Sequence, residues 1–231
     1  DPSTAPVTDP REAAAVFRSG IEAYEAESFE EAARDFRSLL PRFSSSSVHY
    51  NLGNTFYRLR EYPEAILHYE KAFALDPSHP DIRANLNLAR EAASVEPPAQ
   101  PPLAFIGHRL PWTTWTWILA VSVWGLAATL VLSRPIGLTN LWRNFILLLF
   151  GFLLALSVMA QVTWFATANR AIVLTRDTPL RIAPTASSPL EARLPAGSEV
   201  NAKESYGDYY RIKLPDGTEG WVLQSTVKKV R

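Results

Sequence analysis

Two long uncharged runs restrict what this 231-residue sequence can fold into. The first extends from Trp115 to Leu132 and the second from Phe145 to Ala166, and neither contains a charged side chain. Each run approaches or exceeds the roughly 18 to 20 apolar residues that cross the hydrocarbon core of a bilayer. A buried hairpin in a soluble protein is the alternative, but a chain of this size is too small to enclose two such helices. We therefore predict two transmembrane helices, at residues 110–133 and 144–167.

The distribution of charge divides the chain into three parts. No acidic residue occurs from Pro97 to Arg176, although basic and acidic side chains balance at 23 each over the whole chain. The first 96 residues carry 10 basic and 16 acidic side chains, whereas residues 171–231 carry 9 and 7. The neutral net charge and the mean hydropathy of −0.04 therefore arise from cancellation between unlike segments. We predict a multidomain membrane protein rather than one soluble domain.

Several functional classes are disfavoured by what the sequence lacks. It contains no cysteine, which excludes thiolate metal sites, disulfides and cysteine nucleophiles. The histidines lack metal-ligand spacing, and no glycine-rich phosphate loop is present: His49, His68, His79 and His108. No segment combines basic and aromatic residues in the manner of a nucleic-acid-binding surface. We expect no catalytic residues, no metal or cofactor, no nucleic-acid partner and no enzymatic activity.

The acidic N-terminal third repeats itself at an offset of 33 residues. Four pairs of residues share this offset: Gly20 and Gly53, Phe29 and Tyr62, Ala32 and Ala65, and Phe36 and Tyr69. This spacing resembles the tetratricopeptide repeat, in which small residues let two antiparallel helices approach closely. The second unit is the better match, because Ser19 stands in the first unit where Leu52 stands in the second.

Local signals support helices throughout this third. Asp9–Glu12 and Ser28–Glu31 are typical of capping boxes, and Pro63 suits the first turn of a helix. A further helix start at Ser78 opens an amphipathic stretch. We predict an all-α domain of two repeats and a capping helix at residues 10–95, after an N-terminal tail at residues 1–9. Two repeats leave apolar surface uncovered, so we expect help from a cap or a partner.

The resemblance implies that the first helix of each pair lines a concave groove that binds a partner. The implied groove residues are Phe17, Ile21, Tyr24, Tyr50, Asn54, Tyr57 and Arg58. Such a groove can accept a helix or an extended peptide, with the amide of Asn54 holding the peptide backbone. The alternative is that aromatic residues such as Phe17 and Tyr57 merely pack between helices. Tetratricopeptide proteins that clamp a C-terminal carboxylate have basic residues where this chain has Phe17, Ile21, Ala84 and Leu88.

The sequence of the middle third predicts a membrane anchor. A Pro-rich linker at residues 96–109 leads into the first span, and tryptophans form a predicted membrane-interface belt: Trp112, Trp115, Trp117, Trp142 and Trp164. The short loop at residues 134–143 carries Arg134 and Arg143 without an acid, which places it in the cytoplasm by the positive-inside rule. Arg109, Arg170 and Arg176 flank the opposite side and weaken this bias. Gly151 and Ala155 form a pair of small residues suited to seating the other span or a partner helix, with chance exposure to lipid as the alternative.

Because the loop is predicted in the cytoplasm and two spans return the chain to the same side, we expect both termini on the periplasmic side of a bacterial inner membrane. Asp1 and the polar residues after it are typical of the start left when a signal peptide is removed, with a trimmed chain as the alternative.

The C-terminal segment, residues 171–231, alternates polar and apolar residues and predicts a small all-β barrel. We expect strands at residues 171–175, 190–194, 199–204, 209–214 and 220–223, with a turn at Pro215–Gly217. The order of these segments resembles the bacterial SH3-like domain. Tyr210, Ile212 and Leu214 should face the core. A candidate binding surface consists of Tyr206, Tyr209 and Trp221, although Trp221 also suits a half-buried structural role.

The complete order of repeats, linker, two spans and SH3-like domain resembles the BatE-like family of the bacterial Bat aerotolerance operon. The resemblance implies partners: membrane-anchored von Willebrand A-type Bat proteins, and a MoxR-type ATPase. We predict a non-enzymatic inner-membrane scaffold that binds partner proteins through a periplasmic groove and also contacts membrane lipid. A cell-wall (peptidoglycan) binding protein acting through the SH3-like domain is one alternative, and a cytoplasmic signalling adaptor is another.

Overall fold

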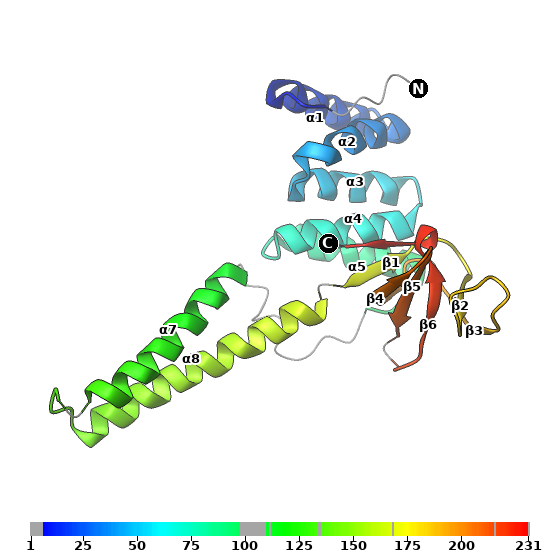
Figure 1. Cartoon of the computed structure of the whole chain (residues 1–231). Helices are drawn as coiled ribbons and strands as arrows, with labels where there is room; N and C mark the ends of the chain where they lie inside the picture. The colour runs from blue at the N-terminus through cyan, green and yellow to red at the C-terminus, as the bar shows by residue number, and fades with distance from the viewer. Residues whose placement is uncertain are drawn as a thin grey trace. The chain divides into compact units, whose positions relative to one another are not determined.

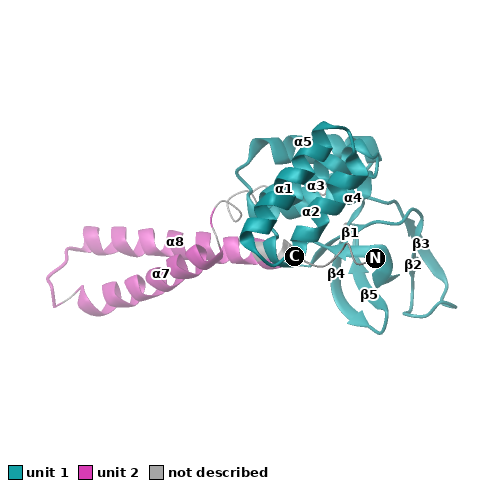
Figure 2. Ribbon diagram, turned by 90° about the horizontal axis from the view of Figure 1, so that it is seen from above, with its two compact units in different colours: residues 1–99, 169–231 teal, residues 100–168 magenta. Residues whose placement is uncertain are grey.

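The computed structural model describes residues 7–97, 110, 112–133, 135–167, 169–214 and 216–230. The chain divides into two compact units, of which the first combines residues 1–99 with 169–231 and the second comprises residues 100–168 (Figure 2). Most of the predicted tail and linker, together with Arg109, Arg134, Pro215 and the side chain of Trp164, lie outside the described residues. The predictions made for those residues stay predictions.

Five helices form the N-terminal part of the first unit (Figure 1). They are α1 (Pro10–Glu25), α2 (Phe29–Phe43), α3 (Ser46–Arg58), α4 (Tyr62–Leu75) and α5 (Pro80–Ala93). The repeated residues explain the packing within each pair. A Cβ atom at Gly20 would lie 2.8 Å from the ring of Phe36, and one at Gly53 would lie 2.6 Å from the ring of Tyr69. Each glycine therefore lets an aromatic ring of the second helix reach the backbone of the first.

The turns between paired helices repeat as well. Glu27 and Arg60, 33 residues apart, adopt φ values of 59° and 62°. The following residues, Ser28 and Glu61, hold φ and ψ near −85° and 65°. Ser28 lies outside the extended region that N-cap residues favour, and its side chain makes no capping hydrogen bond, so the predicted capping box is wrong there. At Asp9 the predicted cap does form, because Oδ1 accepts a hydrogen bond of 2.8 Å from the amide of Arg11.

The described residues of the second unit form α7 (Trp112–Leu132) and α8 (Asn140–Thr167). Both helices are long and apolar enough to cross a membrane. Gly125 lies against the ring of Phe150, leaving no space for a side chain, whereas no atom lies within 4 Å of a Cβ position at Gly151. The prediction that Gly151 and Ala155 seat the other helix is therefore wrong within this hairpin. Ala155 is also exposed.

The tryptophans of the hairpin are not all exposed, as a membrane-interface belt would require. Trp112, Trp117 and Trp142 are exposed, but Trp115 is only 4% exposed. Its backbone carbonyl accepts a hydrogen bond of 2.6 Å from Oγ of Ser157 on α8. Trp115 and Ser122 are seven residues apart on one face of α7, and both are buried. Trp115 therefore packs on the inner face of the hairpin, and the prediction of an interfacial role for its ring is corrected.

An antiparallel sheet of seven strands completes the first unit, in the order β3-β2-β6-β5-β4-β1-β7. The strands are β1 (Arg170–Val173), β2 (Thr178–Arg181), β3 (Leu190–Leu194), β4 (Glu199–Tyr206), β5 (Tyr209–Lys213), β6 (Glu219–Leu223) and β7 (Val227–Lys229). The sequence pattern missed β2, where Pro179 argues against a strand, and β7, where three residues are too few to show alternation. The predicted inward set is confirmed: Ile212 is fully buried, and Tyr210 and Leu214 pack against the same core.

Candidate functional site

A cavity of about 220 Å³ opens between four of the five N-terminal helices. The residues that line it come from α1, α3, α4 and α5: Tyr24, Asn54, Tyr57, Arg58, Tyr69, Asn85 and Leu88. Four of them, Tyr24, Asn54, Tyr57 and Arg58, were predicted as groove residues from the sequence. We call this cavity the groove.

Two amides and a phenol form a hydrogen-bonded group inside the groove. Oδ1 of Asn54 accepts one hydrogen bond of 2.7 Å from the hydroxyl of Tyr69 and another of 3.0 Å from Nδ2 of Asn85. Nδ2 of Asn85 also lies 3.2 Å from the hydroxyl of Tyr50, to which it donates. Burial raises the pKa of Tyr69 above its ordinary value, so this phenol stays neutral and can donate. Both lone pairs of Oδ1 are engaged, and Asn54 can therefore offer a ligand its N–H donors only.

Arg58 lies at the edge of the groove and is positioned by α1 and α2. Nη2 of Arg58 lies 3.2 Å from Oε1 of Glu27, and its guanidinium lies 4.5 Å from the ring centre of Phe29 and 5.9 Å from that of Tyr24. The ion pair is solvent-exposed and adds little stability. The aromatic contacts give this cation a defined direction while leaving N–H groups for a ligand.

Three predicted groove residues are not part of the lining. Phe17 meets the ring of Phe36 edge-on at 5.6 Å, and Ile21 packs with it against the helical core. These two residues pack between helices, as the alternative interpretation proposed. Tyr50 lies near Tyr69, with tilted rings whose centres are 6.1 Å apart, and accepts a hydrogen bond from Asn85 rather than lining the cavity.

Three lining residues are not in the predicted groove set, although the comparison with carboxylate-clamping proteins had placed Leu88 at a groove position. Tyr69 corresponds to Phe36 in the repeat, and its added hydroxyl was the available signal. Asn85 and Leu88 belong to α5, which has no counterpart in the repeats. Their spacing of three residues places them on one helix face, which a search for exposed polar and apolar neighbours could have found.

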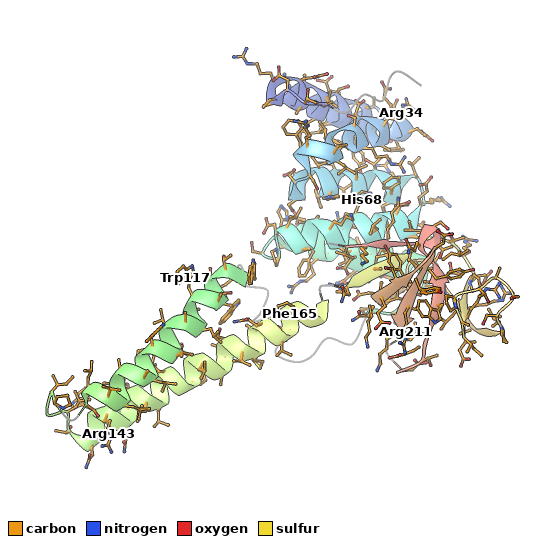
Figure 3. All side chains as sticks on the ribbon, viewed as in Figure 1. Arg34, His68, Trp117, Arg143, Phe165 and Arg211 are labelled. Atoms are coloured by element: carbon orange, nitrogen blue, oxygen red, sulfur yellow. The ribbon has the colours of Figure 1, made fainter. Side chains whose placement is uncertain are left out.

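The structure brings together the residues of the candidate binding surface on the sheet, but only in part as an exposed surface. The rings of Tyr206 and Trp221 meet edge-on with centres 6.3 Å apart, and Tyr209 lies directly opposite Tyr206 in the β4–β5 pairing. Tyr206 is 67% exposed, whereas Trp221 is half-buried, so both interpretations of Trp221 describe part of its environment. Arg211 lies opposite Trp221 on the sheet (Figure 3), is partly exposed, and pairs with Glu219 at 2.8 Å.

Two of the four histidines are buried together inside the helices. Nδ1 of His49 lies 2.9 Å from Nδ1 of His68, and Nε2 of His49 lies 2.9 Å from Oγ of Ser44. His68 lies within the helical part of the first unit (Figure 3). Its ring stacks on that of Phe56, with centres 5.4 Å apart. Burial lowers the pKa of His49 to about 4 and that of His68 well below its ordinary value. Both rings are therefore neutral near pH 7, and one Nδ1–H donates to the other Nδ1.

Two family models match the chain. Residues 46–79 match the tetratricopeptide repeat, and residues 176–228 match the bacterial SH3 domain. The first match covers α3 and α4, and the second runs from the segment before β2 into β7. No curated protein and no solved structure matches the chain. The matches confirm a tetratricopeptide-like helical region, which suggests protein–protein binding, and a bacterial SH3-like domain, which suggests cell-wall binding.

Proposed function

We propose that this protein is a non-enzymatic scaffold, anchored in a bacterial inner membrane, that binds an extended segment of a partner protein in the groove. The groove itself carries the proposal, since residues from four helices converge there with mixed aromatic and donor character. Its volume of about 220 Å³ is below the roughly 300 to 1,000 Å³ of typical small-molecule pockets. One bulky apolar side chain of a partner fits this space better than a metabolite does.

The polar residues of the groove lining favour a partner segment that offers hydrogen-bond acceptors. Asn54 has N–H groups to offer, and Arg58 has only N–H donors. Backbone carbonyls of an extended peptide, and a carboxylate near the mouth, supply the matching acceptors. Tyr24, Tyr57 and Leu88 supply the apolar contact. We infer a segment with a large apolar side chain next to an acidic residue.

The test of the groove compares two exposed leucines. Leu88 is 50% exposed inside the groove, whereas Leu75 is 56% exposed at the end of α4 and is not part of the lining. Leu88→Glu should abolish co-purification of the bound partner from detergent extracts, and Leu75→Glu should leave it intact. Equal partner sets for both variants and the wild type would contradict the groove assignment.

We propose that α7 and α8 are the membrane anchor and that both soluble parts face the periplasm. Two features support this topology: the match to a bacterial SH3 domain, and Arg143 near the α7–α8 connection (Figure 3). Arg170, which the sequence suggested as an opposing charge, is instead paired with Glu70 and Glu199. Arg170 therefore has a structural role within the first unit, although it still counts as a basic residue flanking α8 under the positive-inside rule.

The absence of cysteine allows a direct test of topology. Single substitutions Ser205→Cys on the sheet and Thr139→Cys before α8 introduce exposed thiols. In intact spheroplasts, a membrane-impermeant maleimide should label Ser205→Cys and leave Thr139→Cys unlabelled until the cells are lysed. Labelling in the reverse order would favour the cytoplasmic adaptor.

We further propose membership in the Bat aerotolerance assembly, with von Willebrand A-type Bat proteins and a MoxR-type ATPase as partners. The order of helical repeats, apolar hairpin and SH3-like domain supports this proposal. In native membranes, a photo-crosslinker at position 88 should capture a von Willebrand A-type protein. Capture of only unrelated proteins would reject the Bat assignment while leaving a groove function in place.

A second candidate function is binding of peptidoglycan through the sheet. The edge-on pair of exposed Tyr206 and half-buried Trp221 and the bacterial SH3 match favour it. The full chain in detergent should then sediment with purified cell wall, and Tyr206→Ala should reduce this sedimentation, whereas Tyr57→Ala in the groove should not. No sedimentation of the wild type would reject this function.

A further inference from the structure

Four charges, two of them buried and two partly buried, join the helices to the sheet within the first unit. Glu70 of α4 and Arg90 of α5 form one ion pair, and Arg170 of β1 and Glu199 of β4 form another. Nη2 of Arg170 lies 2.7 Å from Oε2 of Glu70, and Nη2 of Arg90 lies 3.6 Å from Oε2 of Glu199. The charges therefore alternate in sign and sum to zero. The side chain of Glu70 is 2% exposed and that of Arg90 is 8% exposed.

Apolar residues also join the helices to the sheet. Ile172 of β1 and Val230, next to β7, belong to the same hydrophobic core as Leu86 and Ala89 of α5. The turn before β4 also lies against the helices, because a Cβ atom at Gly197 would lie 3.0 Å from Ile66 of α4. The helical region and the sheet therefore share one core across this face, where α4 lies beside β1 (Figure 1).

The same two helices form part of the groove. On α5, Asn85 and Leu88 line the groove, whereas Arg90 belongs to the four-charge cluster. On α4, Tyr69 lines the groove and its neighbour Glu70 belongs to the cluster. Any displacement of α5 from α4 would therefore disturb the cluster on one side and the groove on the other.

We propose that the SH3-like domain is the cap that completes the two tetratricopeptide repeats, and that its docking on α4 and α5 holds the groove in its binding shape. About three repeats are usually needed to cover the apolar faces, and the described helices provide two and a single further helix. Buried ion pairs add little net stability, but removing one partner leaves an uncompensated charge. The cluster thus selects one docked arrangement. The capping claim stands alone, whereas its effect on binding rests on the proposed function of the groove.

Thiol trapping in the full chain tests the cap without a ligand. Ala89 on α5 is fully buried, so Ala89→Cys should react slowly with iodoacetamide while the sheet is docked. Adding Arg170→Gln should raise the rate at least tenfold. Arg211→Gln is the matched control, because its partners Glu204 and Glu219 both belong to the sheet. An unchanged rate in the Arg170→Gln background would overturn the proposal.

Two additions separate undocking from general unfolding. Ala32→Cys on α2 is equally buried and should stay protected when Arg170→Gln exposes position 89. If both positions react, Glu70→Gln is added to Arg170→Gln, leaving the opposite charges of Arg90 and Glu199. Restored protection at position 89 supports the cap, and its absence overturns it. The groove is tested independently by Leu88→Glu: partner capture that survives this change rejects the groove function, even where trapping supports the cap.

Discussion

The helical repeats and the apolar hairpin use the same packing device in different surroundings. Gly53 receives the ring of Tyr69, and Gly125 receives the ring of Phe150. Polar groups differ between the two regions. In the repeats, buried ionisable groups contact one another, as His49 does His68. In the hairpin, the hydroxyl of Ser157 donates to a backbone carbonyl. The comparison teaches that close helix packing needs only a glycine and a ring, whereas the chemistry of buried polar groups follows from what surrounds the helices.

The largest expected effect is at Glu70. Glu70→Gln leaves Arg90 and Arg170 buried with only one carboxylate, and we expect a loss of about 3 to 5 kcal/mol in the free energy of unfolding of the first unit. Urea unfolding in mild detergent, followed by circular dichroism, measures it. Glu64→Gln is the matched control on the same helix, since Glu64 meets Lys228 at 3.8 Å in a more exposed pair. It should cost less than about 1 kcal/mol. Equal losses of stability in the two variants would show that breaking the buried cluster costs no more than breaking an exposed ion pair.

The next effect is a dependence of stability on pH that arises from the histidine pair. His49 has a pKa of about 4 in the folded protein, below the ordinary 6.5 of an exposed histidine. As pH falls below 6.5, the unfolded chain binds a proton that the folded protein does not, so stability should fall until about pH 4 and stay constant above 6.5. The loss for His49 is about 3 kcal/mol at pH 4. Lys71 and Arg37, with Lys228 of the sheet, oppose protonation of the pair further.

Comparison with His49→Gln isolates this contribution from carboxylates that titrate in the same range. Urea unfolding of both proteins from pH 8 to pH 5 gives the stability difference at each pH. The difference should be constant above pH 7 and should shrink steadily below 6.5, because glutamine does not titrate. A difference independent of pH would mean that the pair is already protonated or accessible to water.

Gly53→Ala should have a smaller effect on the repeats. The added methyl group would meet the ring of Tyr69 at 2.6 Å, and overpacking of this kind costs about 1 to 3 kcal/mol. Alanine's better helix propensity offsets about 1 kcal/mol of this cost. Gly151→Ala is the control, because nothing lies within 4 Å of its Cβ position. Urea midpoints measured side by side should fall for Gly53→Ala only.

The sequence was most informative where a physical requirement recurs. The 33-residue offset predicted Gly53 opposite Tyr69, because each repeat needs a small residue facing a ring. The resemblance to the tetratricopeptide repeat, rather than the offset itself, implied Asn54 in the groove. The four-charge cluster could not be found in the same way. Single charges at positions 70, 90, 170 and 199 resemble surface residues in a linear sequence, and only the docked sheet makes them partners. In the linear sequence Arg170 therefore resembles a charge that only flanks the membrane.

In the hairpin, too, the sequence did not identify the residues that make the close contacts, but for a different reason. Its residues are apolar all round, so no periodicity marks the face of α7 that meets α8. The pair Gly151 and Ala155 matched a general pattern, but Gly125 is the residue that approaches a ring. Within the apolar helices, the informative signals were the isolated hydroxyl residues, because a polar group in an apolar environment requires a partner.

Ser157→Ala completes the comparison with the smallest effect. The hydroxyl of Ser157 donates to the carbonyl of Trp115 at 2.6 Å and joins α8 to α7. Hydrogen bonds between membrane helices contribute about 0.6 kcal/mol on average and rarely more than about 1.7. We therefore expect the hairpin to lose about 1 kcal/mol, roughly a quarter of the loss expected for Glu70→Gln. Steric trapping or force unfolding in bicelles measures this loss, with Ser122→Ala as control, because its hydroxyl bonds to Ile118 within the same helix. A loss as large as that for Glu70→Gln would show that polar contacts in the hairpin matter as much as buried charges do in the repeats.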